Sequence, residues 1–461
     1  MNIKVIALIS CLCYGNHAWS QKADDDKIIR QIYDEALENG YAHEDLRDLC
    51  KNIGARLSGS KELEEAVIWG EQTLAALEPD SVYKQGVLVP NWIRSKKETG
   101  YFYSTTGRVN MDLSALGGSV STGTNNFLSA KVVEVQGLED LAKMDTNEIK
   151  GRFVFFNRPF NEKVINTFHA YGSCVDQRWG GANEAAKYGA IGVFVRSMTN
   201  AHDHFAHTGV MHYENLDKAI PAAAISTETA NLLSAQLKND STLTAYMKLG
   251  CYTKDDAESH NVIAEIKGTK YPEQYITIGA HLDSWDLGEG AHDDGAGIVQ
   301  TIEVLRIFKT LDIRPKHSIR FVLFTNEENG ARGARRYAEM ADRNNETHIA
   351  AIESDCGGFS PRGFNLDGSE KDMSRIKTLR EILEPYGLYY FEKGHAGVDI
   401  GPLKNENPDI LLMGLCPDSQ RYFDYHHADS DVFETVNRRE LELGAASMAS
   451  LLYLIDKNMF N

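Results

Sequence analysis

The amino-acid sequence predicts an α/β fold in which a mixed sheet, mostly parallel in its core, is flanked by helices, with a second α/β unit inserted. Three short apolar runs, 275–280, 319–325 and 349–353, have the length and residue types of buried strands, and helix-like segments lie between them. Strands that alternate with crossover helices are typical of a parallel sheet. The 461 residues are too many for one ordinary core, so we expect a second domain or a large insertion.

The composition is that of a folded globular protein with an acidic surface. Hydrophobic residues make up 42% of the chain, charged residues 25%, and the formal net charge is -18. Because an acidic surface repels phosphate groups, it argues against nucleic acid and anionic membrane as partners.

The first 20 residues have the features of a cleavable export signal. Lys4 is their only charge, residues 5–14 are an apolar core, and Ala18-Trp19-Ser20 is a small-x-small cleavage site. A membrane anchor would need about twenty apolar residues. Cys11 follows a loose lipoprotein pattern but lies too close to Met1 for a full apolar core. The sequence therefore predicts a secreted or periplasmic protein.

The cysteines do not form a recognisable pattern. Those beyond the signal are odd in number and widely spaced, which fits neither a disulfide framework nor a zinc finger, although one or two bridges are compatible with them. They are Cys50, Cys174, Cys251, Cys356 and Cys416.

Residues 21–120 are expected to form N-terminal helices and the first part of the main domain. Apolar residues recur on one helical face over 27–38, and a short helix is expected over 44–50. Ser60 has the residue type and position of an N-cap for a helix to about residue 77.

Residues 121–250 are expected to form the insertion, because short predicted strands and helices alternate there without a complete set of catalytic residues. Short strands are predicted at 131–135, 153–156, 191–195 and 222–225, with helices at 181–188 and 227–237. His202, Asp203, His204 and His207 are spaced as metal ligands can be. A solvated polar loop is the preferred interpretation, and a loop rim that touches substrate is the functional alternative.

Residues 251–461 continue the strand and helix alternation. Helices are predicted to about residue 309 and at 331–340, 373–383 and 439–454, with a further strand at 410–413. In such sheets ligands bind beyond the carboxyl ends of the strands. His281, Glu327, Glu328 and Asp355 fall at those ends.

The motif that begins at the first strand end has residues suited to metal binding. His281 is followed by Asp283, which can accept a hydrogen bond from the second ring nitrogen of a metal-bound imidazole. Asp293 and Asp294 lie between glycines, so the backbone can approach a metal closely and one carboxylate can bridge two cations.

The remaining candidates come from later strand ends. Adjacent residues at a strand end point in different directions, so one of Glu327 and Glu328 can bind a metal while the other faces a cleft. Asp355 precedes a Gly-Gly pair after the strand at 349–353. His426 and His427 form an imidazole pair beside an acidic stretch, and His427, with Asp431 four residues on, is preferred.

Taken together, these motifs resemble the M28 family of metallopeptidases. The resemblance runs from about residue 56 to the last helix, and the motifs that carry it are 281–286, 290–295, 327–328, 353–355 and 427–431. It implies a zinc-exopeptidase fold, a protease-associated domain for the insertion, and a di-zinc catalytic domain over 251–461.

The resemblance also implies roles for the individual residues. His281 and Asp355 would bind one zinc, Glu328 and His427 the other, and Asp293 would bridge them, with a cis peptide to Asp294. Glu327 would be the general base, and Asp283 would orient His281.

The implied reaction is hydrolysis of dipeptides or short peptides by a dipeptidase or carboxypeptidase, and a homodimer is also implied. An aminopeptidase uses the same metal centre and stays open as an alternative. A glutaminyl-cyclase-like enzyme with one zinc and a non-catalytic receptor-like homologue are less favoured, because the full set of ligands is present.

Overall fold

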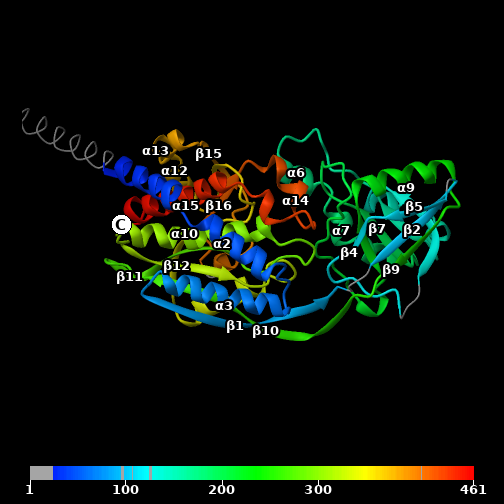
Figure 1. Ribbon diagram of the computed structural model, residues 1–461, viewed down its shortest axis with the longest axis horizontal. Coiled ribbons are helices and arrows are strands. Elements are labelled where there is room, and N and C mark those ends of the chain that lie inside the picture. The colour runs from blue at the N-terminus through cyan, green and yellow to red at the C-terminus, as the bar shows by residue number, and fades with distance from the viewer. Residues whose placement is uncertain (1–23, 95–97, 106, 124–126, 406, 461) are drawn as a thin grey trace, which may run out of the picture.

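The computed structural model describes residues 24–94, 98–105, 107–123, 127–405 and 407–460. The predicted export signal lies outside these residues. Two sheets, each of eight strands, organise the described chain. Residues 99–248, which hold one of these sheets, are called the second unit, and the other sheet with its helices is called the first unit. Figure 1 shows the second unit at one end of the long axis.

The first unit is built on a mixed sheet with a parallel centre. The neighbours β12, β11, β13 and β16 run parallel, while β10 and β14 join this centre antiparallel. The strands, in their order across the sheet, are β1 (Ser81–Ile93), β10 (Tyr252–Ile266), β12 (His317–Phe324), β11 (Tyr271–His281), β13 (Thr347–Glu353), β16 (Leu411–Pro417), β14 (Pro361–Asp367) and β15 (Tyr390–Lys393). The predicted mostly parallel core is confirmed.

Helices cover both faces of this sheet. Along β12, Phe321 and Leu323 pack into the core on one face, whereas Val322 and Phe324 pack into the core on the other, because side chains alternate along a strand. The first face is covered by the helix at 24–39 and by α2 (Ala42–Asp48), the π-helical turn Leu49–Ile53, α3 (Lys61–Ala76), α10 (Ala296–Thr310), α12 (Glu370–Thr378), α13 (Arg380–Leu383) and α15 (Arg438–Asn458). The opposite face is covered by α11 (Arg332–Arg343) and the 3-10 turn η5 (Gly401–Asn405).

The second unit is a smaller mixed α/β layer. Its strands, in sheet order, are β3 (Gly107–Met111), β2 (Thr99–Ser104), β9 (Thr244–Lys248), β5 (Leu128–Val135), β6 (Phe153–Phe156), β7 (Gly192–Arg196), β8 (Ala222–Ile225) and β4 (Leu113–Ala115). Its helices are α4 (Leu138–Leu141), α5 (Thr146–Ile149), α6 (Thr167–Gly172), α7 (Asp176–Trp179), α8 (Gly181–Lys187) and α9 (Thr227–Asn239). The sheet takes in β2, β3 and β4, which precede residue 121, the start predicted for the insertion.

An aromatic cluster joins the two units. Phe160 and Met198 of the second unit pack with Phe359, Tyr422 and Phe423 of the first unit. Tyr422 and Phe423 belong to α14 (Tyr422–Tyr425), which Figure 1 shows beside α6 between the two units. The second unit therefore packs directly against α14.

The local signals in the sequence locate most of the core elements. Ser60 caps α3 by accepting a hydrogen bond from the main-chain N–H of Leu63 at 3.1 Å, as predicted. The predicted helix over 373–383 is two helices, α12 and α13. The strands β1, β10, β14 and β15, and β2, β3, β4 and β9 of the second unit, were not predicted. Many β1 residues stay partly exposed because it is an edge strand, so it lacks the continuous apolar run of a central strand.

Two further sequence expectations can be compared with the described residues. No helix among them is long and apolar enough to span a membrane. The cysteines are unbonded, so neither of the bridges that their number allowed is formed; these are Cys50, Cys174, Cys251, Cys356 and Cys416.

Candidate metal centre

The carboxyl ends of three adjacent parallel strands bring the predicted residues to one edge of the sheet. His281 is the last residue of β11, Glu327 and Glu328 follow β12, and Asp355 follows β13. Because β12, β11 and β13 are neighbours with the same direction, these ends meet. Asp293 reaches the same point from the turn η3 (Ala291–Gly295), which leads into α10.

Three side chains form a first group of potential ligands around His281. The Nε2 atom of His281 lies 3.4 Å from Oδ1 of Asp293 and 3.4 Å from Oδ1 of Asp355. The other ring nitrogen, Nδ1, donates to the main-chain carbonyl of Asp283 at 2.9 Å. This hydrogen bond holds the proton on Nδ1 and leaves the Nε2 lone pair directed at the two carboxylates.

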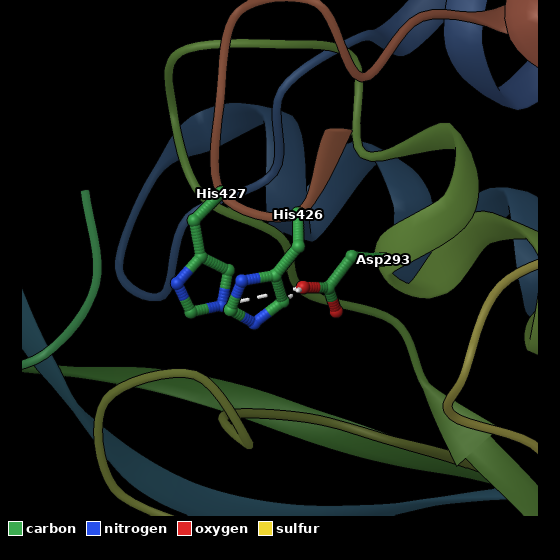
Figure 2. Close-up of side chains that lie close together, drawn as sticks. All are labelled: Asp293, His426 and His427. Carbon is green, nitrogen blue, oxygen red and sulfur yellow. Dashed lines mark ion pairs between the residues drawn. The ribbon is translucent and has the colours of Figure 1, made fainter. Parts of the chain in front are cut away.

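A second group forms around His427 and shares Asp293 with the first. The Nε2 atom of His427 lies 3.2 Å from Oδ2 of Asp293 and 3.2 Å from Oε2 of Glu328. His426 stacks on His427 with ring centroids 3.5 Å apart, but its Nε2 is 3.8 Å from Asp293. Figure 2 shows the two overlapping rings with the Asp293 carboxylate facing them. The distances favour His427 as the ligand, although both histidines could form a three-residue group with Asp293.

The carboxylate of Asp283 has a different contact from the one predicted. Its Oδ1 is 3.8 Å from Nδ1 of His281, so the main-chain carbonyl replaces it as the acceptor for the ring. The carboxylate instead accepts from the main-chain N–H groups of Glu327 at 3.0 Å and Glu328 at 3.3 Å, and from the Ser58 hydroxyl at 3.2 Å. Asp283 therefore anchors the segment that carries both glutamates, and touches His281 through its backbone.

A second buried carboxylate anchors the Asp293 segment. Asp431 accepts from the main-chain N–H of His292 at 2.7 Å and of Asp293 at 3.1 Å. The Asp293–Asp294 peptide bond is cis, as the resemblance implied. The carboxylate of Asp294 accepts from the N–H groups of His281 and Gly297, so it helps to fix the loop instead of adding a ligand. The sequence showed Asp431 only as an acid near His427, because its partners lie far away in the chain.

Several acidic side chains are buried together at this centre, and each affects the pKa of its neighbours. Burial raises the pKa of Glu327 well above its ordinary value and that of Glu328 to about 7, and neighbouring carboxylates add to both shifts. Burial lowers the pKa of His427, but the charges of Glu328 and Asp293 outweigh it and raise that pKa to about 9. Such a concentration of buried negative charge is stabilised by cations.

The histidine-rich loop of the second unit does not gather into a cluster of its own. His202 and His204 are exposed, and His204 lies 2.8 Å from Asp112. In the described ranges, the groups of three residues suited to a metal all lie at the centre described above. His207 is the exception in this loop, because it is buried and its Nδ1 donates to the main-chain carbonyl of His426 at 2.8 Å.

The second unit also contributes the wall behind His427. Nδ1 of His427 lies 3.3 Å from the main-chain carbonyl of Thr208 and 3.4 Å from Nη1 of Arg178 in α7. Neither contact was predicted from the sequence. The loop of the second unit therefore reaches the centre through the main-chain carbonyl of Thr208, and its contact with a substrate stays a prediction.

Comparisons with known proteins give one consistent result. The model of peptidase family M28 matches residues 261–452. Carboxypeptidase Q from Bos taurus is 31% identical over 92% of this chain and 86% of its own length, and that from Homo sapiens is 32% identical with the same coverage. The crystal structure of a peptidase M28 precursor from Shewanella amazonensis is 32% identical, with a TM-score of 0.90 over 95% of this chain and 98% of its own. A zinc aminopeptidase from Bacillus subtilis shares the fold at 19% identity, with a TM-score of 0.63 over 90% of this chain and 93% of its own.

Proposed function

Because the chain belongs to peptidase family M28, we propose that it is an exported di-zinc exopeptidase that hydrolyses dipeptides or short peptides. One observation carries this proposal: the two oxygens of Asp293 face two different imidazoles. Oδ1 lies 3.4 Å from Nε2 of His281, and Oδ2 lies 3.2 Å from Nε2 of His427. A carboxylate shared between two ligand groups is suited to a two-metal hydrolytic centre.

The ligand atoms fit zinc in type and spacing. Zinc takes imidazole nitrogen and carboxylate oxygen at about 2.0–2.2 Å in tetrahedral geometry, so two of its ligands lie roughly 3.4 Å apart. The measured separations at His281 and His427 are 3.2–3.4 Å. We assign His281 and Asp355 to one ion, Glu328 and His427 to the other, and Asp293 to both. When bound, the two ions supply a water of lowered pKa and polarise the scissile carbonyl.

Glu327 is assigned the role of general base. Its main-chain N–H donates to Asp283, which fixes where its side chain begins. Burial raises the pKa of its carboxyl group, and a raised pKa suits a group that first takes a proton from water and then passes it to the leaving amine. Glu327 would perform both transfers, and Asp283 would position it through the backbone.

The second unit is proposed to be a protease-associated domain that limits the length of the substrate. Arg178 and Thr208 lie against His427, so one side of the centre is walled by the second unit. A centre walled in this way favours a dipeptide or a short peptide over a long chain. The export of the enzyme rests on the signal features of residues 1–20.

Zinc analysis combined with a dipeptide panel tests the proposal. We expect two zinc ions per purified chain and hydrolysis of free dipeptides. One zinc per chain would favour a glutaminyl-cyclase-like enzyme, and inertness toward the whole panel at full zinc load would favour a receptor-like homologue. Cleavage of dipeptide amides as fast as free dipeptides, with N-acetyl dipeptides resistant, would show an aminopeptidase instead.

A further inference from the structure

We infer that Arg94 positions the ligands of one of the two proposed metal ions and not those of the other. The ion assigned to His281 and Asp355 is called the first ion, and the one assigned to Glu328 and His427 is called the second ion. Arg94 joins the two loops that hold the ligands of the second ion, so it is a positioning residue that acts through its neighbours. The inference rests on the proposed function, because the two ions belong to that proposal.

Arg94 lies where the chain passes from the first unit into the second, directly after β1. Its side chain is only 9% exposed, and its Nε donates to both carboxylate oxygens of Asp286 of the first unit, at 2.9 Å each. From the second unit, the main-chain carbonyl of Ala115 accepts from Nη1 at 2.6 Å, and the Thr208 hydroxyl accepts from Nη2 at 3.1 Å. The Thr208 hydroxyl in turn donates to the carbonyl of Ala115 at 2.8 Å. One guanidinium group therefore ties the two units together through directional hydrogen bonds.

Thr208 forms a reciprocal pair with His427. The main-chain N–H of Thr208 donates to the main-chain carbonyl of His427 at 2.9 Å. Since Nε2 of His427 is the proposed ligand atom, Nδ1 carries the proton and donates to the carbonyl of Thr208 at 3.3 Å. His427 also has a φ of 63°, a left-handed conformation that is unfavourable for a residue with a side chain and that its surroundings must hold. The second unit therefore sets both the backbone and the ring of His427.

Glu328, the other ligand of the second ion, is held by the residue next to Asp286. The main-chain N–H of Trp285 donates to Oε1 of Glu328 at 3.2 Å, and the Trp285 side chain is buried. Because Trp285 and Asp286 are adjacent, a shift of the Asp286 carboxylate would move the N–H group that Glu328 accepts from. Arg94 therefore links the segment that fixes Glu328 to the segment that fixes His427.

The ligands of the first ion are held differently. In the described part of the chain, the hydrogen bonds and ion pairs of His281 and Asp355 are made within the first unit. The ring of His281 is oriented by the carbonyl of Asp283, which lies two residues further along the same loop. Loss of the Arg94 contacts should therefore weaken the second ion and leave the first ion in place.

Zinc binding to the full zinc-free chain tests the inference. Removal of the charge would leave the buried carboxylates of Asp286 and Glu98 without their cation, so the variants are chosen to avoid this. Arg94→Lys keeps the charge but loses the planar fork, and Thr208→Val replaces only the hydroxyl that Arg94 contacts. In zinc titrations against a competing chelator, Arg94→Lys should bind the second ion about 10–100-fold more weakly than wild type, and the first ion within about threefold. Thr208→Val should weaken the second ion by about tenfold, at the lower end of that range.

A double-mutant cycle identifies the ion that is weakened. His427→Ala removes a ligand of the second ion, so the zinc that this variant keeps reports on the first ion alone. Adding Arg94→Lys to His427→Ala should change the affinity for that zinc by less than about threefold. Arg320→Lys is the matched control, because the Arg320 side chain is 7% exposed and also pairs with two carboxylates, those of Glu265 and Glu346, which are not proposed ligands. This control should keep the wild-type affinity for both ions.

Several outcomes would overturn the inference. Equal weakening of both ions in Arg94→Lys, or a further loss of affinity in the His427→Ala background, would make Arg94 a general support of the fold. Wild-type affinity for both ions in Arg94→Lys and Thr208→Val would show that the second ion does not depend on these contacts. A wild type that binds fewer than two zinc ions would reject the proposed two-metal centre itself, before any variant is compared.

Discussion

Replacing Asp283 by asparagine tests how the segment that carries Glu327 and Glu328 is held. In the wild type, Oδ1 accepts from the N–H of Glu327 at 3.0 Å, and Oδ2 accepts from the N–H of Glu328 at 3.3 Å and from Ser58 at 3.2 Å. An asparagine has one acceptor oxygen and one NH2 group. In either orientation of the amide, at least one main-chain donor therefore faces another donor.

The size of the effect follows from these contacts. Asp283 is fully buried, so the displaced N–H loses its acceptor without gaining water. An unsatisfied buried donor costs about 1–3 kcal/mol, and loss of a hydrogen bond to a charged group costs about as much. We expect Asp283→Asn to lower the free energy of unfolding by about 2–4 kcal/mol. Because Glu327 and Glu328 are displaced, kcat/KM should also fall roughly 10–100-fold.

Urea unfolding of the zinc-free protein measures the change in the free energy of unfolding. Dipeptide hydrolysis by the zinc-loaded protein measures the change in kcat/KM. Asp312→Asn is the matched control, because Asp312 is 75% exposed and pairs only with Arg314 at the surface. An Asp283→Asn variant that unfolds within about 0.5 kcal/mol of wild type and keeps its kcat/KM would refute the assigned role of Asp283.

Two further predictions concern the second ligand group and the pH dependence of stability. His427→Ala should lose one of two zinc ions. His426→Ala should keep both, because Nε2 of His426 lies 3.8 Å from Asp293, too far for a shared zinc ligand set. Equal zinc loss in metal analysis of the two dialysed variants would contradict the assignment of His427 as the ligand. Burial raises the pKa of Glu442 to about 8 from an ordinary value of 4.5. Between these two pH values the folded chain holds a proton that the unfolded chain releases. The stability that is present below pH 4.5 is therefore lost as the pH rises toward 8. Between pH 5 and pH 8.5 the free energy of unfolding of Glu442→Gln should therefore fall by a few kcal/mol less than that of wild type, at about 1.4 kcal/mol per pKa unit. Identical decreases in urea unfolding of the two proteins would show that Glu442 does not cause the pH dependence.

Much of the centre could be predicted because its residues lie next to strong local signals. The apolar runs of β11, β12 and β13 are buried on both faces, and the polar residues after them therefore stand out. Parallel strands bring such ends together without any further information. For the same reason His281, Glu327 and Asp355 could be expected at one edge of the sheet before any contact was known.

The contacts that hold the centre together could not be predicted, because they join distant parts of the chain. Asp431 binds the backbone of His292 and Asp293 from more than a hundred residues away. Arg178 reaches His427 from another unit. The hydrogen bond that orients the His281 ring could not be predicted either. Only the structure shows that the main-chain carbonyl of Asp283, and not its carboxylate, accepts from Nδ1 of His281.

Turnover by the Glu327→Gln variant, measured with its zinc content, tests the central claim most directly. Glutamine keeps the size of the side chain but cannot accept the proton of the attacking water. A general base contributes typically 10²–10⁴-fold, so kcat should fall by about that factor while two zinc ions per chain are retained. A zinc-replete Glu327→Gln enzyme that keeps kcat within about tenfold of wild type would contradict the claim that Glu327 is the base of a two-metal peptidase.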